Sequence, residues 1–159
     1  DNTVIVTMHR RENHEKMDEW FEALDNLAKT FYNQYRFILP IHPNPNVQKH
    51  RHLLKYVKIV DPVPYDEFLE MLASCSYVIT DSGGLQEETS FLGKRSIVCR
   101  KVTERPEGLG GFSVLCAEPE ELLALFCEMV EKPNPSGKCP YGDGESGPRI
   151  VGVLLEELE

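Results

Sequence analysis

The strongest constraint on the fold is a regular alternation of short β-branched runs with segments of helical periodicity. Apolar runs at 3–7, 36–41, 57–61 and 77–81 are each followed by a segment whose apolar residues recur every three or four positions. Connections of this length require parallel strands joined by right-handed crossovers, which place helices on both faces of the sheet. We therefore predict an α/β fold with a doubly wound, mostly parallel, Rossmann-like sheet.

The remaining elements continue this pattern. Further strands are expected at 95–100 and 112–116, and helices are expected at 17–32, 46–57, 65–75, 85–93 and 119–132. Gly93 suits the end of the fourth helix, because glycine readily adopts the left-handed conformation that closes many helices. A loop rich in proline and glycine, 133–147, precedes a terminal helix. A chain of 159 residues is expected to form a single domain, here residues 1–159.

Composition narrows the choice of partners. The formal charge of −9 disfavours ligands held by bulk attraction, so we expect no nucleic acid and no membrane as partner. No apolar stretch approaches the ~20 residues that span a bilayer, and we expect a cytoplasmic protein. The five cysteines are widely spaced, which favours reduced thiols over a zinc site or redox motif. The start at Asp1, directly before a strand, suggests a domain of a longer protein.

Ligands of doubly wound sheets bind beyond the carboxyl ends of the strands, and "DSGGLQEE" (81–88) lies at one such end. Gly83 and Gly84 would let a phosphate approach the unpaired N–H groups of a helix start, where the Ser82 hydroxyl could add a hydrogen bond. Glu88 lies one turn further along, where its carboxylate could accept ribose hydroxyls. A plain turn with a solvated acidic helix face would use the same residues. Both interpretations stay open on this stretch alone.

A second polar segment, "KVTERPEG" (101–108), follows the fifth strand. Pro106 restrains the backbone of Arg105 to extended geometry, and the fork of guanidinium donors suits a diphosphate. The alternative is a surface loop in which Arg105 pairs with Glu104 or Glu107.

The first and second strands also end in polar segments. "TMHRRENHE" (7–15) gathers histidines and arginines at the predicted ligand edge. His9 and His14 lack further ligands at convincing spacing, so we expect no metal. In "PIHPNPNV" (40–47), prolines hold His42 at the strand end, where it could cap a turn or contact a ligand.

Four motifs in this order resemble a known family: "TMHRREN" (7–13), "HPNPNV" (42–47), "DSGGLQEE" (81–88) and "TERPE" (103–107). They are similar to the carboxyl-terminal half of the non-hydrolysing UDP-N-acetylglucosamine 2-epimerases, and "PYGDGESGPRI" (140–150) resembles that family's ending. Full enzymes of the family have two Rossmann-like domains in a GT-B-type arrangement, with the active site between them. The resemblance implies that this chain is one half of that fold and that the amino-terminal domain is absent.

The resemblance also implies a UDP site. Its residues would be Ser82, Gly83 and Gly84 on phosphate, Glu88 on ribose, Arg105 on the nucleotide, Phe68 at the uracil, and His9 as the catalytic residue that contacts the diphosphate. Arg10 and His42 match residues that help bacterial members to hold a second, activating UDP-N-acetylglucosamine molecule. Val63 and Met8 depart from the family's usual residues.

The implied reaction interconverts UDP-N-acetylglucosamine and UDP-N-acetylmannosamine by anti elimination of UDP and its re-addition, with no cofactor. This half would stabilise the departing diphosphate, whereas the acid/base carboxylates would come from the amino-terminal domain. The full-length protein would be an isomerase and a homodimer. We expect the isolated chain to be inactive and at most a weak binder of UDP.

Other functions stay open on the sequence. An epimerase for a modified substrate, such as UDP-2,3-diacetamido-glucuronic acid, would share this half, because the sugar-selecting surface lies partly in the absent domain. Hydrolysing relatives are disfavoured by the form of "DSGGLQEE", and a glycosyltransferase donor domain by the His9 and Arg105 motifs. A non-catalytic UDP-sugar-binding module is the remaining alternative.

Overall fold

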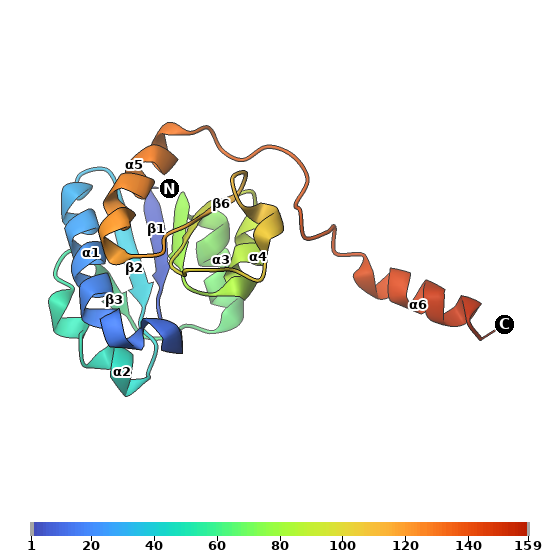
Figure 1. The fold of residues 1–159 in the computed structure, drawn as a ribbon, viewed down its shortest axis with the longest axis horizontal. Coiled ribbons are helices and arrows are strands. Elements are labelled where there is room, and N and C mark those ends of the chain that lie inside the picture. Colours follow the sequence, from blue (N-terminus) through green and yellow to red (C-terminus); the bar gives the residue numbers. More distant parts are fainter. Residues whose placement is uncertain (1, 159) are drawn as a thin grey trace.

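The computed structural model describes residues 2–158, and its six strands form one sheet (Figure 1). The strands are β1 (Thr3–Thr7), β2 (Arg36–Pro40), β3 (Lys58–Val60), β4 (Tyr77–Thr80), β5 (Arg95–Val98) and β6 (Ser113–Leu115). Their order is β3-β2-β1-β4-β5-β6, and every neighbouring pair is parallel. The predicted doubly wound, Rossmann-like class is confirmed. The order reverses between β1 and β4, where such sheets bind ligands.

Helices cover both faces of this sheet. They are α1 (Met17–Thr30), α2 (Pro45–Gln48), α3 (Tyr65–Ser74), α4 (Gly83–Phe91), α5 (Leu122–Glu131) and α6 (Ser146–Glu156), with short 3-10 turns η1 (Arg11–Lys16), η2 (Arg51–Leu53), η3 (Pro106–Gly108) and η4 (Pro119–Glu121). On the face covered by α1 and α5, Trp20 and Phe126 are buried in the larger core. The opposite face carries α3 and α4 around a smaller core that includes Ile5 and Leu72. Side chains alternate along β1, so Val4 belongs to the first core and Ile5 to the second.

The prediction of one helix over 46–57 is wrong. The structure has a single helical turn, α2, followed by η2. The carboxylate of Asp25, on α1, accepts the backbone N–H groups of Lys55, Tyr56 and Val57 at 2.7, 2.6 and 3.2 Å. These amides are therefore bound to a side chain from another element, and the chain enters β3 without a continuous helix.

The start of α4 also differs from the expectation. It begins at Gly83, two residues before the predicted start at 85, so both glycines lie in its first turn. It ends at Phe91, and Gly93 follows with φ of 65°, as predicted for a glycine that closes a helix.

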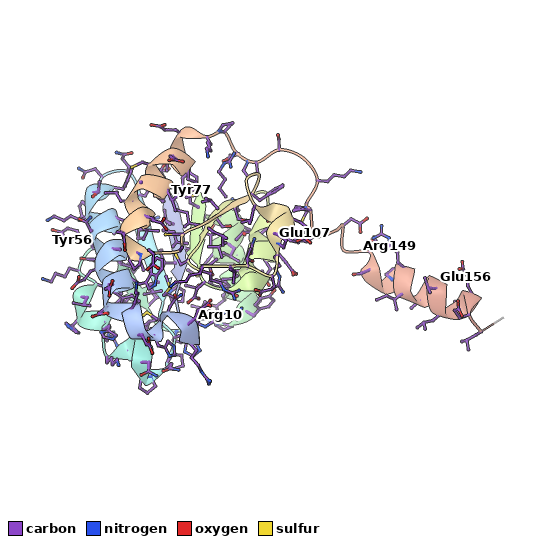
Figure 2. All side chains as sticks on the ribbon, in the orientation of Figure 1. Arg10, Tyr56, Tyr77, Glu107, Arg149 and Glu156 are labelled. Atoms are coloured by element: carbon purple, nitrogen blue, oxygen red, sulfur yellow. The ribbon has the colours of Figure 1, made fainter. Side chains whose placement is uncertain are left out.

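The last helix, α6, lies apart from the sheet at the end of an extended connection (Figure 1). Its residues are all exposed, and Arg149 and Glu156 project from it into solvent (Figure 2). Apolar side chains on it are exposed too, including Ile150, Val153 and Leu154. Among residues 2–158, no helix has the length and apolar character needed to cross a membrane.

Candidate nucleotide-binding site

A pocket of about 350 Å³ opens where the strand order reverses. Its walls are the segments that follow β1, β2, β3 and β4, together with residues of α3 and α4. Thr7 and Thr80, the last residues of β1 and β4, join these two strands through hydroxyl oxygens 2.6 Å apart. The pocket is therefore at the edge of the sheet that the topology predicts for a ligand.

The first turn of α4 presents backbone donors to this pocket. The N–H of Ser82 is already bound to Thr80 Oγ1 at 3.0 Å, and the first helical bond runs from the Gln86 N–H to the Ser82 carbonyl. The N–H groups between them, at Gly83, Gly84 and Leu85, belong to the part of a helix that has no intrahelical acceptor. No acidic residue occupies this turn. An anion here would meet oriented N–H groups and the positive end of the helix dipole.

Glu88, one turn further along α4, lines the same pocket and has a partner that the sequence did not reveal. The hydroxyl of Tyr65, at the start of α3, donates to Glu88 Oε1 at 2.6 Å. This hydrogen bond with the carboxylate raises the pKa of Tyr65. It fixes one oxygen of Glu88, and among residues 2–158 no hydrogen-bond partner is found for the other, which can accept from a ligand.

The loop after β1 is held in place by the buried carboxylate of Asp81. Its Oδ2 accepts the backbone N–H groups of His9 at 2.9 Å and Arg10 at 2.7 Å, and the side-chain amide of Asn13 at 3.1 Å. Asp81 is completely buried at the end of β4. The position of His9 at the pocket is thus set by the neighbouring strand. The rings of His9 and His42, which both line the pocket, are stacked with their centroids 5.0 Å apart.

Arg105 lies beside Gly83. A Cβ on Gly83 would come within 2.4 Å of Arg105 Nη1 and 2.5 Å of Glu104 Oε1, so a larger residue here would force the ends of these two side chains to shift. The guanidinium pairs with Glu104 at 2.7 Å and more closely with Glu87. The pairing with Glu104 is the one expected of a surface loop, and Glu87 is an additional partner. The bond to Glu87 raises the pKa of Arg105, which keeps the side chain cationic.

Gln86 fixes the backbone of Arg105 through a closed ring of hydrogen bonds. The Gln86 Nε2 donates to the Arg105 carbonyl at 2.8 Å, and its Oε1 accepts from Thr103 Oγ1 at 2.7 Å. Thr103 Oγ1 in turn accepts the Arg105 N–H at 3.1 Å. Gln86 is completely buried in α4. The glycine turn and the arginine loop are therefore joined as one unit.

The structure brings the nine predicted site residues to one region. Six of them line the pocket: His9, His42, Phe68, Ser82, Gly84 and Glu88. The other three, Arg10, Gly83 and Arg105, lie next to it around Glu104, whose carboxylate is 3.8 Å from the Arg10 guanidinium. Within the described part of the chain, no three side chains of His, Cys, Asp or Glu gather closely enough to hold a metal ion.

Sequence reasoning missed three supporting residues: Tyr65, Asp81 and Gln86. Asp81 and Gln86 lie inside the quoted stretch "DSGGLQEE", where a carboxylate and an amide next to the glycine turn were the available signal. No local pattern around Tyr65 indicated its role, because its partner Glu88 is distant in the sequence.

A parallel sheet with a glycine-lined helix start at its reversal point, a carboxylate one turn on and an arginine alongside is the arrangement typical of nucleotide-binding domains. The family model for UDP-N-acetylglucosamine 2-epimerase matches residues 1–155, and this chain belongs to that family.

Individual members agree with this assignment. The UDP-N-acetylglucosamine 2-epimerase of Bacillus subtilis is 35% identical over 167 residues, an alignment that covers 98% of this chain and 44% of that protein. The crystal structure of the Neisseria meningitidis enzyme bound to UDP-N-acetylglucosamine has a TM-score of 0.87 at 32% identity, and covers 98% of this chain and 45% of that one. The Methanocaldococcus jannaschii enzyme in complex with UDP-N-acetylglucosamine and UDP has a TM-score of 0.83 at 32% identity, over 98% of this chain and 46% of that one. This chain therefore spans about half the length of the relatives it matches, and its fold is one half of their GT-B-type fold.

Proposed function

We propose that this chain is the nucleotide-binding half of an epimerase that interconverts UDP-N-acetylglucosamine and UDP-N-acetylmannosamine. The observation that carries the proposal is the convergence of the α4 start, Glu88 and Arg105 around the pocket, in a chain that belongs to the epimerase family. The relatives with bound UDP-N-acetylglucosamine support the same ligand class.

In this proposal each part of UDP has its own contacts. The N–H groups at Gly83 and Gly84 and the Ser82 hydroxyl bind phosphate, because an anion is stabilised at a helix start. Glu88, held by Tyr65, accepts the ribose hydroxyls. Phe68 lines the pocket on α3 and is assigned to the uracil.

The chemistry required of this half is stabilisation of a leaving group. Elimination breaks the bond between C1 and the diphosphate oxygen and the C2–H bond, and re-addition forms both again with the C2 proton on the other face. The net oxidation state is unchanged, so no redox cofactor is needed. Arg105 and His9 would face the charge that develops on the diphosphate. We assign the groups that move the C2 proton to the amino-terminal half.

Arg10 and His42 are proposed to contact a second, activating UDP-sugar. Both lie at the same edge of the sheet as the UDP pocket, and His42 lines it. The amino-terminal half is proposed as the main partner, and the exposed apolar residues of α6 are available for contact with it. A homodimeric full-length enzyme and a cytoplasmic location remain predictions.

An activity measurement on two samples tests this proposal. The 159-residue chain alone should produce no UDP-N-acetylmannosamine from UDP-N-acetylglucosamine, as followed by NMR of the anomeric protons. The same chain joined to the amino-terminal half of the Bacillus subtilis relative should produce it. Turnover by the isolated chain at rates usual for enzymes would contradict the assignment of the proton-transfer groups to the amino-terminal half.

The family match and the names of the relatives favour this substrate over the alternatives. A modified sugar such as UDP-2,3-diacetamido-glucuronic acid would require that this chain, joined to its own amino-terminal half, converts that substrate and not UDP-N-acetylglucosamine, because the sugar-selecting surface lies partly in that half. A non-catalytic module would bind UDP with no conversion in either sample.

A further inference from the structure

Tyr141 lies in the connection between α5 and α6, far along the chain from the glycine turn, yet its hydroxyl lies against the Arg105 loop. The hydroxyl donates to the Arg105 carbonyl at 2.8 Å and accepts the Gly108 N–H at 3.0 Å. Gln86 Nε2 lies 3.2 Å from the same oxygen. One hydroxyl thus connects the Arg105 loop, η3 and α4.

The contact between Tyr141 and this loop is closely packed. A Cβ added to Gly108 would come within 2.4 Å of the Tyr141 hydroxyl oxygen and 3.1 Å of its ring carbon Cζ. Gly108 itself is buried. The ring and hydroxyl of Tyr141 therefore lie directly against Gly108, and a side chain at this position would force the hydroxyl to shift.

The carbonyl of Arg105 accepts from both Gln86 and Tyr141, while its N–H is bound to Thr103. Both polar groups of its backbone are thereby fixed. The guanidinium projects from this backbone to a place beside Gly83, at the start of α4. If one of the two donors to the Arg105 carbonyl were lost, the loop could move and the guanidinium would be displaced. A guanidinium binds a diphosphate strongly only when its N–H groups are correctly placed.

We propose that Tyr141 is a positioning residue. It holds Arg105 beside the first turn of α4, where the guanidinium can bind the diphosphate. The segment between α5 and α6 is then part of the UDP site, although Tyr141 does not line the pocket. This inference rests on the proposed function, because it requires that Arg105 meets a diphosphate.

Calorimetry with UDP and with uridine separates positioning from general support of the fold. In the 159-residue chain, Tyr141→Phe keeps the ring and removes the hydroxyl. It should weaken UDP binding about fivefold and leave uridine binding unchanged, since uridine has no diphosphate. Gly108→Ala, which displaces the same hydroxyl, should have the same selective effect. Tyr32→Phe removes an exposed hydroxyl elsewhere and should change neither affinity.

A double-mutant cycle completes the test. In an Arg105→Ala background, Tyr141→Phe should have no further effect on UDP affinity, because its target is gone. Equal loss of UDP and uridine binding would show a structural role and overturn the inference, as would undiminished UDP binding in both variants. Failure of the unaltered chain to bind UDP would refute the proposed function and the inference with it. UDP binding that is weakened by substitutions at Ser82 and Glu88 but not by Tyr141→Phe would refute this inference and leave the proposed function intact.

Discussion

The imidazole ring of His42 stacks on that of His9, with centroids 5.0 Å apart and planes inclined by 25°. The two histidines come from the ends of β1 and β2, and both line the pocket. Burial lowers the pKa of His42, positive charge on His9 and His14 lowers it further, and the Asp81 carboxylate opposes both effects. A second positive charge at this stack is therefore unfavourable.

We predict that His42 titrates below the ordinary histidine value of about 6.5. The unfolded chain then binds a proton more readily than the folded one, so the contribution of His42 to stability is complete above about pH 6.5 and is lost as the pH falls through the folded pKa. NMR titration of the ring protons measures this. His9→Gln should raise the His42 pKa part of the way, and a His42 pKa at or above 6.5 in the unaltered chain would contradict the prediction.

Gly84→Ala should separate ligand binding from stability. A Cβ at Gly84 has Ser82 Oγ as its nearest neighbour, at 3.9 Å, so the folded chain accommodates the methyl group. Stability should stay the same or rise by up to about 1 kcal/mol, because alanine favours a helix. UDP affinity should fall at least about tenfold, since the methyl group would lie on the proposed path of the phosphate. Gly152→Ala, also in an open helical position, is the matched control for the calorimetry and should leave UDP affinity unchanged.

Glu87→Gln should increase UDP affinity. Glu87 pairs with the Arg105 guanidinium. In the proposed function it would have to release this guanidinium before a diphosphate could take its place. Exposed ion pairs are worth about 0.2–1 kcal/mol, so the gain should be at most about fivefold. It should shrink as salt is added, because screening weakens the same pair. An affinity below that of the unaltered chain at low salt would mean that Glu87 aids UDP binding.

Asp81→Asn should destabilise the fold. The Asp81 carboxylate is completely buried and accepts three N–H groups, while no hydrogen-bond partner to its Oδ1 is found among the described residues. A neutral amide accepts these bonds less strongly, and we expect a loss of about 1–3 kcal/mol in the free energy of unfolding. Urea denaturation measures it. Unchanged stability would show that the three N–H groups find other acceptors.

Much of the fold was predictable because its signals are local. Apolar runs and helical periodicity located the strands of the sheet. The rule that ligands bind beyond the carboxyl ends of parallel strands then directed attention to the segments after β1, β2 and β4, which contain His9, His42 and Ser82. The stretch "DSGGLQEE" itself suggested phosphate contacts for Ser82 and Gly83 and a ribose contact for Glu88, and the family resemblance favoured these roles over a plain turn.

The parts that could not be predicted depend on contacts between distant residues. At the end of the helix expected over 46–57, Asp25 accepts amides about thirty positions away from it, and these amides make no helical bonds. Tyr65 reaches Glu88, and Tyr141 reaches the Arg105 loop, only after the chain has folded. Periodicity contains no information about such pairs, because neither partner changes the local pattern.

The central claim is that this half of the proposed epimerase forms the UDP-binding site. Calorimetric titration of the 159-residue chain with UDP tests this claim most directly. The account predicts measurable binding that falls about 10–100-fold when Ser82→Ala and Glu88→Gln are combined, since the first removes a hydroxyl donor to phosphate and the second replaces a carboxylate by a weaker, neutral acceptor. Glu128→Gln, on α5 at the opposite face of the sheet, should bind UDP like the unaltered chain. Absence of UDP binding, or binding that is the same in the double variant, would contradict the account.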